Sequence, residues 1–320
     1  MRVLVTGGAG FLGSHLVRRL LADGHEVIAL DNLETSTWEN LADVLSSPRL
    51  ARIEHDVTSP YDVGRVDRVY NLACAASPPR YQARRVHTTL TSVLGTLHAL
   101  EAASRHGARV LQASTSEVYG DPEVHPQRED YRGSVDPVGP RACYDEGKRC
   151  AETLVMDYHR EHGADVRIVR IFNTYGPAMD PADGRVVSNF IRQALEGEPL
   201  TVYGDGTQTR SLCYVDDLVD GLVGVMERAR TPEPINLGNP TEMTVREIAE
   251  RVLRAVGGGR IVHRPLPADD PKRRRPDIAR AYAEIGFTPR VAFDVGLPRT
   301  IEWFRRRLSK TAPARATGAR

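Results

Sequence analysis

The chain has 320 residues, of which 41% are hydrophobic and 27% are charged, and its formal net charge at pH 7 is +1. These values are ordinary for a soluble globular protein of one large or two modest domains. The nearly balanced charge gives no reason to expect a nucleic acid or membrane partner. The sequence also lacks a run of the roughly 18 apolar residues that a membrane span needs.

The cysteines and histidines indicate neither a disulfide framework nor a metal site. The histidines show no metal-ligand spacing, and there is no Cys-x-x-Cys pair among Cys74, Cys143, Cys150 and Cys213. We therefore expect reduced thiols, no bound metal and a cytoplasmic protein. The first predicted strand begins at Arg2, which leaves no room for a signal peptide before it.

Short apolar runs alternate with helical patterns through the first half of the chain. The runs end at residues 6, 31, 56, 73, 114 and 172. The helical patterns cover residues 11–22, 88–106 and 144–162. Strands that alternate with helices imply right-handed crossovers between parallel strands. We therefore predict an α/β fold with a Rossmann-type doubly wound parallel sheet, covered by helices on both faces.

Turn signals become frequent after Asn173, and shorter helices are predicted at residues 187–196, 215–227, 244–256 and 298–308. We assign residues 1–172 to a cofactor-binding domain, with a return segment near 210–238. Residues 173–308 are assigned to a smaller substrate-binding lobe. Residues 309–320 are small, basic and polar, and we expect a disordered tail there.

A glycine-rich segment lies between the first predicted strand and the first predicted helix. Gly7, Gly10 and Gly13 have the spacing G-x-x-G-x-x-G, which allows a tight turn and close approach of the backbone to a pyrophosphate at the helix N-terminus. Asp31 ends the second strand, where a carboxylate accepts hydrogen bonds from an adenosine ribose and repels a 2′-phosphate. The pattern predicts NAD rather than NADP; the alternative is an ordinary glycine-rich turn.

Tyr144 and Lys148 lie four positions apart on a predicted helix and therefore share one face. A free phenol titrates near pH 10, so only about 0.1% is ionised at pH 7, and a neighbouring lysine charge lowers its pKa. Alone, Tyr-x-x-x-Lys is most often a solvated helix face. Together with the dinucleotide fingerprint, it predicts a base that takes a proton from a sugar hydroxyl.

These two features together resemble the extended short-chain dehydrogenase/reductases, which act on nucleotide sugars. The finer resemblance is to the UDP-glucuronate decarboxylases, also called UDP-xylose synthases. It extends from Arg2 to about Leu308 and is carried by the blocks ASTSEVYGDP (113–122), GPRACYDEGKR (139–149), RIFNTYGP (170–177), DGRVVSNF (183–190) and PLTVYG (199–204).

The chain departs from that family at several positions that we expect to line or flank the pocket. Asn71 stands where the family has His, and Ser92 where Asn is common. Residues 211–214 read Ser-Leu-Cys-Tyr in place of Ala-Phe-Gln-Tyr. The departures leave open whether the nucleotide base is uracil or thymine.

The resemblance implies a redox-neutral decarboxylation of UDP-glucuronate or dTDP-glucuronate. NAD takes hydride from C4 of the sugar while Tyr144 takes the O4 proton. The resulting 4-ketone is β to the C6 carboxylate, so carbon dioxide leaves; C5 is then protonated and hydride returns to C4. Thr115 joins the O4 hydrogen-bond chain, and Lys148 holds the nicotinamide ribose. Glu117 assists ring distortion or proton delivery.

The resemblance also assigns binding residues. Arginine forks match phosphates and carboxylates, so Arg210 and Arg275 are expected at the pyrophosphate or its ribose, and Arg274 or Arg185 at the uronate carboxylate. The run 272–275 could instead be a solvated charge cluster. The expected substrate-binding set is Ser116, Asn173, Arg185, Val187, Tyr203, Gln208, Arg210, Arg274 and Arg275. The expected cofactor-binding set is Gly7, Gly10, Phe11, Leu12, Gly13, Asp31, Asn32, Asp56, Val57, Leu72, Ala73, Ser114, Tyr144 and Lys148.

Other functions remain open. The enzyme could release the 4-keto pentose and NADH rather than xylose, or it could be a nucleotide-sugar 4-epimerase or 4,6-dehydratase. A dehydratase commonly has Asp-Glu where this chain has Ser116-Glu117. A non-enzymatic nucleotide-sensing scaffold would usually have lost Tyr144 or Lys148. We also expect a homodimer, formed by helices 88–106 and 144–162 as a four-helix bundle across a two-fold axis.

Overall fold

The computed structural model describes residues 1–265 and 273–311. Within these residues, seven strands form the main sheet in the order β11-β6-β5-β4-β1-β2-β3, and every neighbouring pair is parallel. The strands are β1 (Arg2–Thr6), β2 (Glu26–Asp31), β3 (Leu50–Glu54), β4 (Arg68–Asn71), β5 (Arg109–Thr115), β6 (Val166–Ile171) and β11 (Ile235–Leu237). The predicted doubly wound parallel sheet is confirmed.

Helices cover both faces of this sheet, because successive side chains of each strand point to opposite sides. Val3 and Val5 belong to a core cluster that includes α1 (Phe11–Ala22) and α6 (Val215–Arg228). Leu4, between them, belongs to another cluster, with α3 (Arg85–Ser104) and α4 (Ala142–His162).

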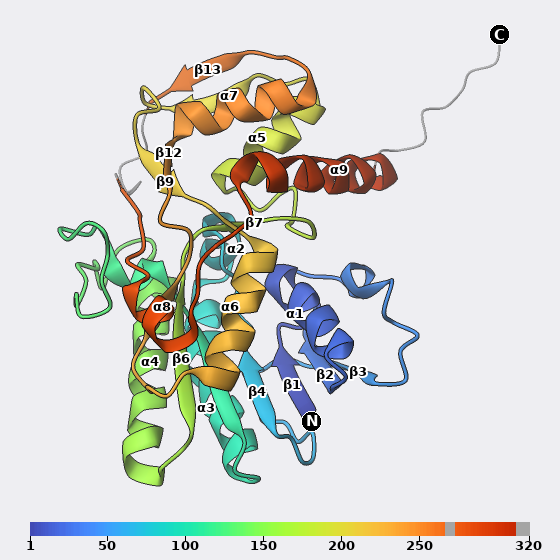
Figure 1. The fold of residues 1–320 in the computed structure, drawn as a ribbon, viewed down its shortest axis with the longest axis vertical. Coiled ribbons are helices and arrows are strands. Elements are labelled where there is room, and N and C mark those ends of the chain that lie inside the picture. The colour runs from blue at the N-terminus through green and yellow to red at the C-terminus, as the bar shows by residue number, and fades with distance from the viewer. Residues whose placement is uncertain (266–272, 312–320) are drawn as a thin grey trace.

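A smaller lobe lies above the carboxyl ends of the main strands in Figure 1. Within it β13 pairs with β8 in parallel, and β12 pairs with β9 antiparallel. Thr244 and Glu247 form a capping box at the start of α7, which fixes where that helix begins. The elements of this part are α5 (Val186–Leu195), β8 (Leu200–Tyr203), β9 (Thr209–Ser211), β12 (Glu242–Thr244), α7 (Val245–Val256), β13 (Ile261–Arg264) and α9 (Phe293–Thr311).

The chain crosses between the two parts more than once. After β9, the short strand β10 (Cys213–Tyr214) pairs with β7 (Thr174–Tyr175), and α6 then leads to β11 at the edge of the main sheet beside β6. Segment 213–237 therefore packs with the part that contains the main sheet. At the other end of the chain, Arg307 and Lys310 of α9 both form ion pairs with Glu39.

Several short elements lie outside the predicted ones, and one helix is longer than expected. The short elements are η1 (Trp38–Leu41), α2 (Pro78–Ala83), η2 (Ser116–Tyr119) and α8 (Ala279–Ile285). The helix expected over 298–308 begins at Phe293, contains Pro298, and ends at Thr311, inside the predicted tail. The rest of that tail, 312–320, lies outside the described residues, as does Lys272 of the basic run. No described helix is long and apolar enough to cross a lipid bilayer.

Candidate functional site

A cavity of about 1100 Å³ lies at the carboxyl ends of the main strands, where the smaller lobe faces them. The strand order reverses between β1 and β4, and ligands of open α/β sheets bind outside the strand ends at such a reversal. Sites for one small molecule are roughly 300–1,000 Å³, so this cavity is larger than the usual site for a single small ligand.

Most residues of the predicted site line this cavity. Asp56 and Arg275, although both are described, lie off its wall, and the Arg275 guanidinium faces Glu242 at 3.8 Å instead. The predicted residues that do line it are Gly7, Gly10, Phe11, Leu12, Gly13, Asp31, Asn32, Val57, Leu72, Ala73, Ser114, Thr115, Ser116, Glu117, Tyr144, Lys148, Asn173, Arg185, Val187, Tyr203, Gln208, Arg210 and Arg274.

The glycine loop has no space for side chains. Gly7 has a φ of +70°, and a Cβ on it would lie 3.0 Å from the Cα of Ala73. A Cβ on Gly13 would lie 2.0 Å from the Gly7 carbonyl oxygen. The loop leads directly into α1 at Phe11, so the N-terminus of the helix faces the cavity with its positive dipole end.

Asp31 fixes the loop that follows β2. Its carboxylate accepts hydrogen bonds from the Ala9 amide at 3.0 Å, the Leu33 amide at 2.9 Å and the Ser36 hydroxyl at 2.6 Å. The carboxylate therefore ties the glycine loop to the loop after β2 while remaining on the cavity wall.

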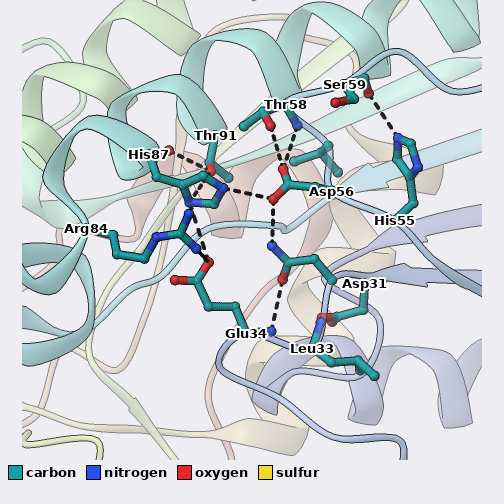
Figure 2. Close-up of polar contacts among 12 residues, drawn as sticks. Asp31, Leu33, Glu34, His55, Asp56, Thr58, Ser59, Arg84, His87 and Thr91 are labelled. Atoms are coloured by element: carbon teal, nitrogen blue, oxygen red, sulfur yellow. Dashed lines mark hydrogen bonds and ion pairs between the residues drawn. The ribbon is translucent and has the colours of Figure 1, made fainter.

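Asp56 is the centre of a neighbouring polar cluster (Figure 2). It accepts hydrogen bonds from the Thr58 amide and hydroxyl, from Asn32 at 3.0 Å and from His87 at 2.8 Å. Burial would raise the pKa of Asp56, but these hydrogen bonds hold it well below its usual range. His87 also lies 3.5 Å from Glu34, so the cluster joins α3 to the loop after β2. His87 and Glu34 line the cavity, and our sequence analysis missed both.

Tyr144 and Lys148 are brought together on the cavity wall by the first two turns of α4, as predicted, and both are buried. Burial raises the pKa of the Tyr144 phenol, and a hydrogen bond with Thr115 opposes the rise. We expected Lys148 to lower this pKa. Its ammonium instead donates to the Ala113 carbonyl at 2.9 Å and lies 6.0 Å from the phenol ring centroid, so burial dominates.

Glu117 lies in η2, immediately after β5. The Thr115 hydroxyl caps this turn by accepting from the Glu117 amide at 3.2 Å. The Glu117 carboxylate forms ion pairs with both Arg274 and Arg141. Burial would raise the pKa of Glu117, but the two guanidinium groups lower it. Arg141 also lines the cavity. It stands in the block that resembles the decarboxylases, which is the signal that could have identified it.

The other predicted substrate residues have partners of their own. Arg185 binds the Asp183 carboxylate through Nε and Nη2. Arg210 donates to the Thr209 carbonyl at 2.9 Å, and Gln208 donates to the Tyr203 carbonyl at 2.8 Å.

Among the departures from the decarboxylase pattern, Leu212 lines the cavity, whereas Asn71, Ser92, Ser211 and Cys213 flank it, each next to a lining residue. Asn71 is buried in a hydrogen-bond network, where it accepts from Thr6 at 2.6 Å and donates to Gln112 at 2.7 Å. Ser92 is buried on α3, and Cys213 is buried in the core. These substitutions therefore act on packing rather than on direct ligand contact.

Residues 3–238 match a family model described as the NAD dependent epimerase/dehydratase family. The chain is 53% identical over 309 residues to UDP-glucuronic acid decarboxylase 1 from Arabidopsis thaliana, covering 96% of this chain and 71% of that protein.

Solved structures share the fold over nearly the whole chain. The dTDP-glucose 4,6-dehydratase from Streptomyces venezuelae, with NAD bound, has a TM-score of 0.86 at 33% identity, covering 97% of this chain and 98% of that chain. The UDP-glucose 4-epimerase from Thermotoga maritima, with UDP-glucose, has a TM-score of 0.86 at 30% identity, covering 96% and 100%.

Proposed function

The chain belongs to the NAD dependent epimerase/dehydratase family and, within it, to the UDP-glucuronic acid decarboxylases. We propose that it is an NAD-dependent decarboxylase of UDP-glucuronate. The observation that carries the proposal is the meeting of Tyr144, Thr115 and Glu117 in one cavity with the buried guanidinium of Arg274. A neutral sugar needs no such group, whereas a uronate carboxylate is matched by an arginine fork.

The residues present fit NAD. Protein backbone occupies the space where Cβ atoms of Gly7 and Gly13 would lie, so these glycines allow the tight turn and close packing that a dinucleotide-binding loop needs. Asp31 and Asn32 receive the adenosine ribose, Leu72 and Ala73 flank the loop, and Lys148 holds the nicotinamide ribose. When bound, NAD supplies a hydride acceptor that returns the same hydride.

The chain's own residues move the protons and hold the sugar. Tyr144 takes the O4 proton as C4 is oxidised, and the Thr115 hydroxyl lies in the same hydrogen-bond chain. Burial is the largest cause of the raised phenol pKa, with Cys74 and Glu117 adding to it, and the Arg185 charge opposes that rise. Loss of carbon dioxide from the β-keto acid leaves an enolate, which is protonated at C5 before C4 is reduced.

The anionic parts of the substrate meet the arginines. Arg274 binds the C6 carboxylate while it keeps Glu117 in place, and Arg185 is the second candidate for that carboxylate. Arg210 binds the diphosphate, with Asn173 at a phosphate or sugar oxygen and Tyr203 near the base. Comparing the turnover of UDP-glucuronate with that of dTDP-glucuronate decides whether the preferred base is uracil or thymine.

Purified enzyme is incubated with UDP-glucuronate, dTDP-glucuronate or UDP-glucose, and carbon dioxide, NADH and nucleotide-sugar products are measured. We expect carbon dioxide from a nucleotide uronate, with UDP-xylose as product. Release of the 4-keto pentose with NADH would indicate the variant that stops before reduction. Conversion of UDP-glucose without uronate turnover would make the chain an epimerase or dehydratase and overturn the proposal.

We also propose a homodimer formed through α3 and α4. Val86 and Leu90, four positions apart on α3, expose 74% and 41% of their surface, so one face of this helix offers apolar side chains to a second copy. Light scattering that gives the mass of a monomer would contradict this. The cytoplasmic location stays a prediction from the sequence.

A further inference from the structure

Asp145 is a buried carboxyl behind the cavity that the reaction above does not use. It follows Tyr144 in the first turn of α4, and its side chain is 8% exposed. It is not among the cavity-lining residues. Among the described residues and atoms, no donor reaches its Oδ1, and its other oxygen lies 3.8 Å from Nε of Arg141.

Charged groups from several elements surround this carboxyl. Glu117 of η2 faces it, and Arg141 lies between the two carboxylates, forming ion pairs with both. Arg274 forms an ion pair with the other carboxylate oxygen of Glu117. Glu146 on the same helix adds negative charge, and the Tyr81 phenol of α2 lies close enough for Asp145 to influence its titration.

The pKa values of the two carboxyls are shifted in opposite directions. Burial raises the pKa of Asp145 to about 7, the Glu117 charge adds to the rise, and Arg141 and Arg274 oppose it. Those same arginines lower the pKa of Glu117. The positive dipole end of α4 favours the ionised form of Asp145 in the first turn, but burial has the larger effect on its pKa. Neighbouring carboxyls whose environments separate them in this way commonly divide the acid and base roles.

Arg141 and Arg274 are the cations that act on Asp145 in the ligand-free protein, and Arg210 and Arg185 also act on Glu117. A uronate carboxylate that binds Arg274 adds one negative charge to this group, and it draws guanidinium charge away from both carboxyls.

We propose that Asp145 takes up one proton from solvent when the carboxylate of a nucleotide-linked uronate enters the cavity. This rests on the proposed function. Neutral Asp145 no longer competes with Glu117 for the Arg141 guanidinium, so Asp145 is a positioning residue that acts through Arg141. The proton balance agrees with that of the reaction. Breaking the C5–C6 bond releases carbon dioxide, and C5 gains a proton, so each turnover consumes one proton.

The test measures protons taken up on binding. NAD-loaded protein with Tyr144→Phe, which stops turnover, is titrated by calorimetry at about pH 8 in buffers of different ionisation enthalpy. UDP-glucuronate is compared with UDP-glucose, which carries the same diphosphate without the carboxylate. We expect the protein to take up more protons when it binds UDP-glucuronate than when it binds UDP-glucose. The difference should approach one proton per site.

Asp145→Asn, added to that protein, should abolish the difference between the two ligands. Glu146→Gln is the matched control, because it removes the adjacent, 39% exposed carboxylate and should preserve the difference. A uronate-specific uptake that persists in Asp145→Asn overturns the proposal.

A second measurement does not depend on the folding of that variant. Infrared difference spectra of the Tyr144→Phe protein should gain the carbonyl band of a protonated carboxyl with UDP-glucuronate and not with UDP-glucose. Binding of UDP-glucuronate without this band overturns the inference while the proposed function stands. A lack of carbon dioxide release from the unmodified enzyme overturns the proposed function, and this inference with it.

Discussion

The rings of Tyr81 and Tyr144 lie parallel, with their centroids 4.9 Å apart and an interplanar angle of 2°. Tyr81 comes from α2 and is buried, and its hydroxyl has no hydrogen-bond partner within the described residues. The proposed base therefore rests on a second aromatic ring, which fixes the plane of the phenol before any ligand binds.

Tyr81→Phe keeps this stack and removes only an unpartnered hydroxyl. We expect kcat/KM to change little and the free energy of unfolding to be equal or slightly higher. Tyr81→Ala removes the ring, and we expect the free energy of unfolding to fall by about 3–5 kcal/mol with a large loss of kcat. Urea denaturation and steady-state kinetics check both. Equal kcat for the phenylalanine and alanine variants would contradict a role for the stack.

Arg274→Met should destabilise the protein because it removes one of the two arginines, Arg141 and Arg274, that form ion pairs with the Glu117 carboxylate. Removing one member of a largely buried ion pair costs about 3 kcal/mol or more. A second substitution, Glu117→Gln, should restore much of that loss without restoring activity. Arg306→Met is the control: its pair with Glu302 is exposed, and we expect a loss below about 1 kcal/mol. Losses that simply add in the Arg274 and Glu117 double variant would refute this coupling.

Gly13→Ala should weaken NAD binding, since the new Cβ would lie 2.0 Å from the Gly7 carbonyl oxygen and must displace the loop. We expect the dissociation constant for NAD to rise about tenfold or more, which corresponds to about 1.4 kcal/mol. Gly107→Ala has nothing within 4 Å of its Cβ, and its positive φ costs about 1 kcal/mol of stability. Fluorescence titration should find that the dissociation constant for NAD is unchanged in the Gly107→Ala variant. An equal rise in the Gly13→Ala and Gly107→Ala variants would indicate general destabilisation of the fold.

The stability of the ligand-free protein should depend on pH through Asp145. A folded-state pKa of about 7 lies above the unfolded value of about 3.9, so the folded state binds more protons between these two pH values. The contribution of Asp145 to stability is thus fully present below about pH 4 and is lost as the pH rises through 7. Asn cannot ionise, so the Asp145→Asn variant lacks this loss. We therefore expect the free energy of unfolding of the variant, relative to that of the unchanged protein, to be a few kcal/mol higher at pH 8 than at pH 5. Urea denaturation at the two pH values checks it, and equal shifts in both proteins would contradict it.

The sequence was a good guide to the sheet and to the backbone parts of the site, because these depend on local signals. The spacing of Gly7, Gly10 and Gly13 predicts the loop, and Tyr144 and Lys148 share a face through helical periodicity alone. Asp31 was located in the same way, at the end of a short apolar run.

What the sequence could not give depends on long-range packing. Arg141 reaches Glu117 only because η2 turns back toward the start of α4, and Tyr81 meets Tyr144 only because α2 packs there. Asp56 ends an apolar run, which suggests a ligand contact. Its carboxylate instead accepts hydrogen bonds from Asn32 and His87, and Asp56 does not line the cavity. Such partners come from separate elements, and no spacing rule connects them.

The position of β11 has a consequence for biosynthesis. The strand that completes the main sheet comes from residues 235–237, so a ribosome must extrude α5, β8 and β9 before that sheet can close. Until then β6 is an uncovered edge with unpaired amides and carbonyls, the kind of surface on which nascent chains aggregate. A polypeptide cut at residue 172 would keep that edge permanently, and we expect it to be insoluble.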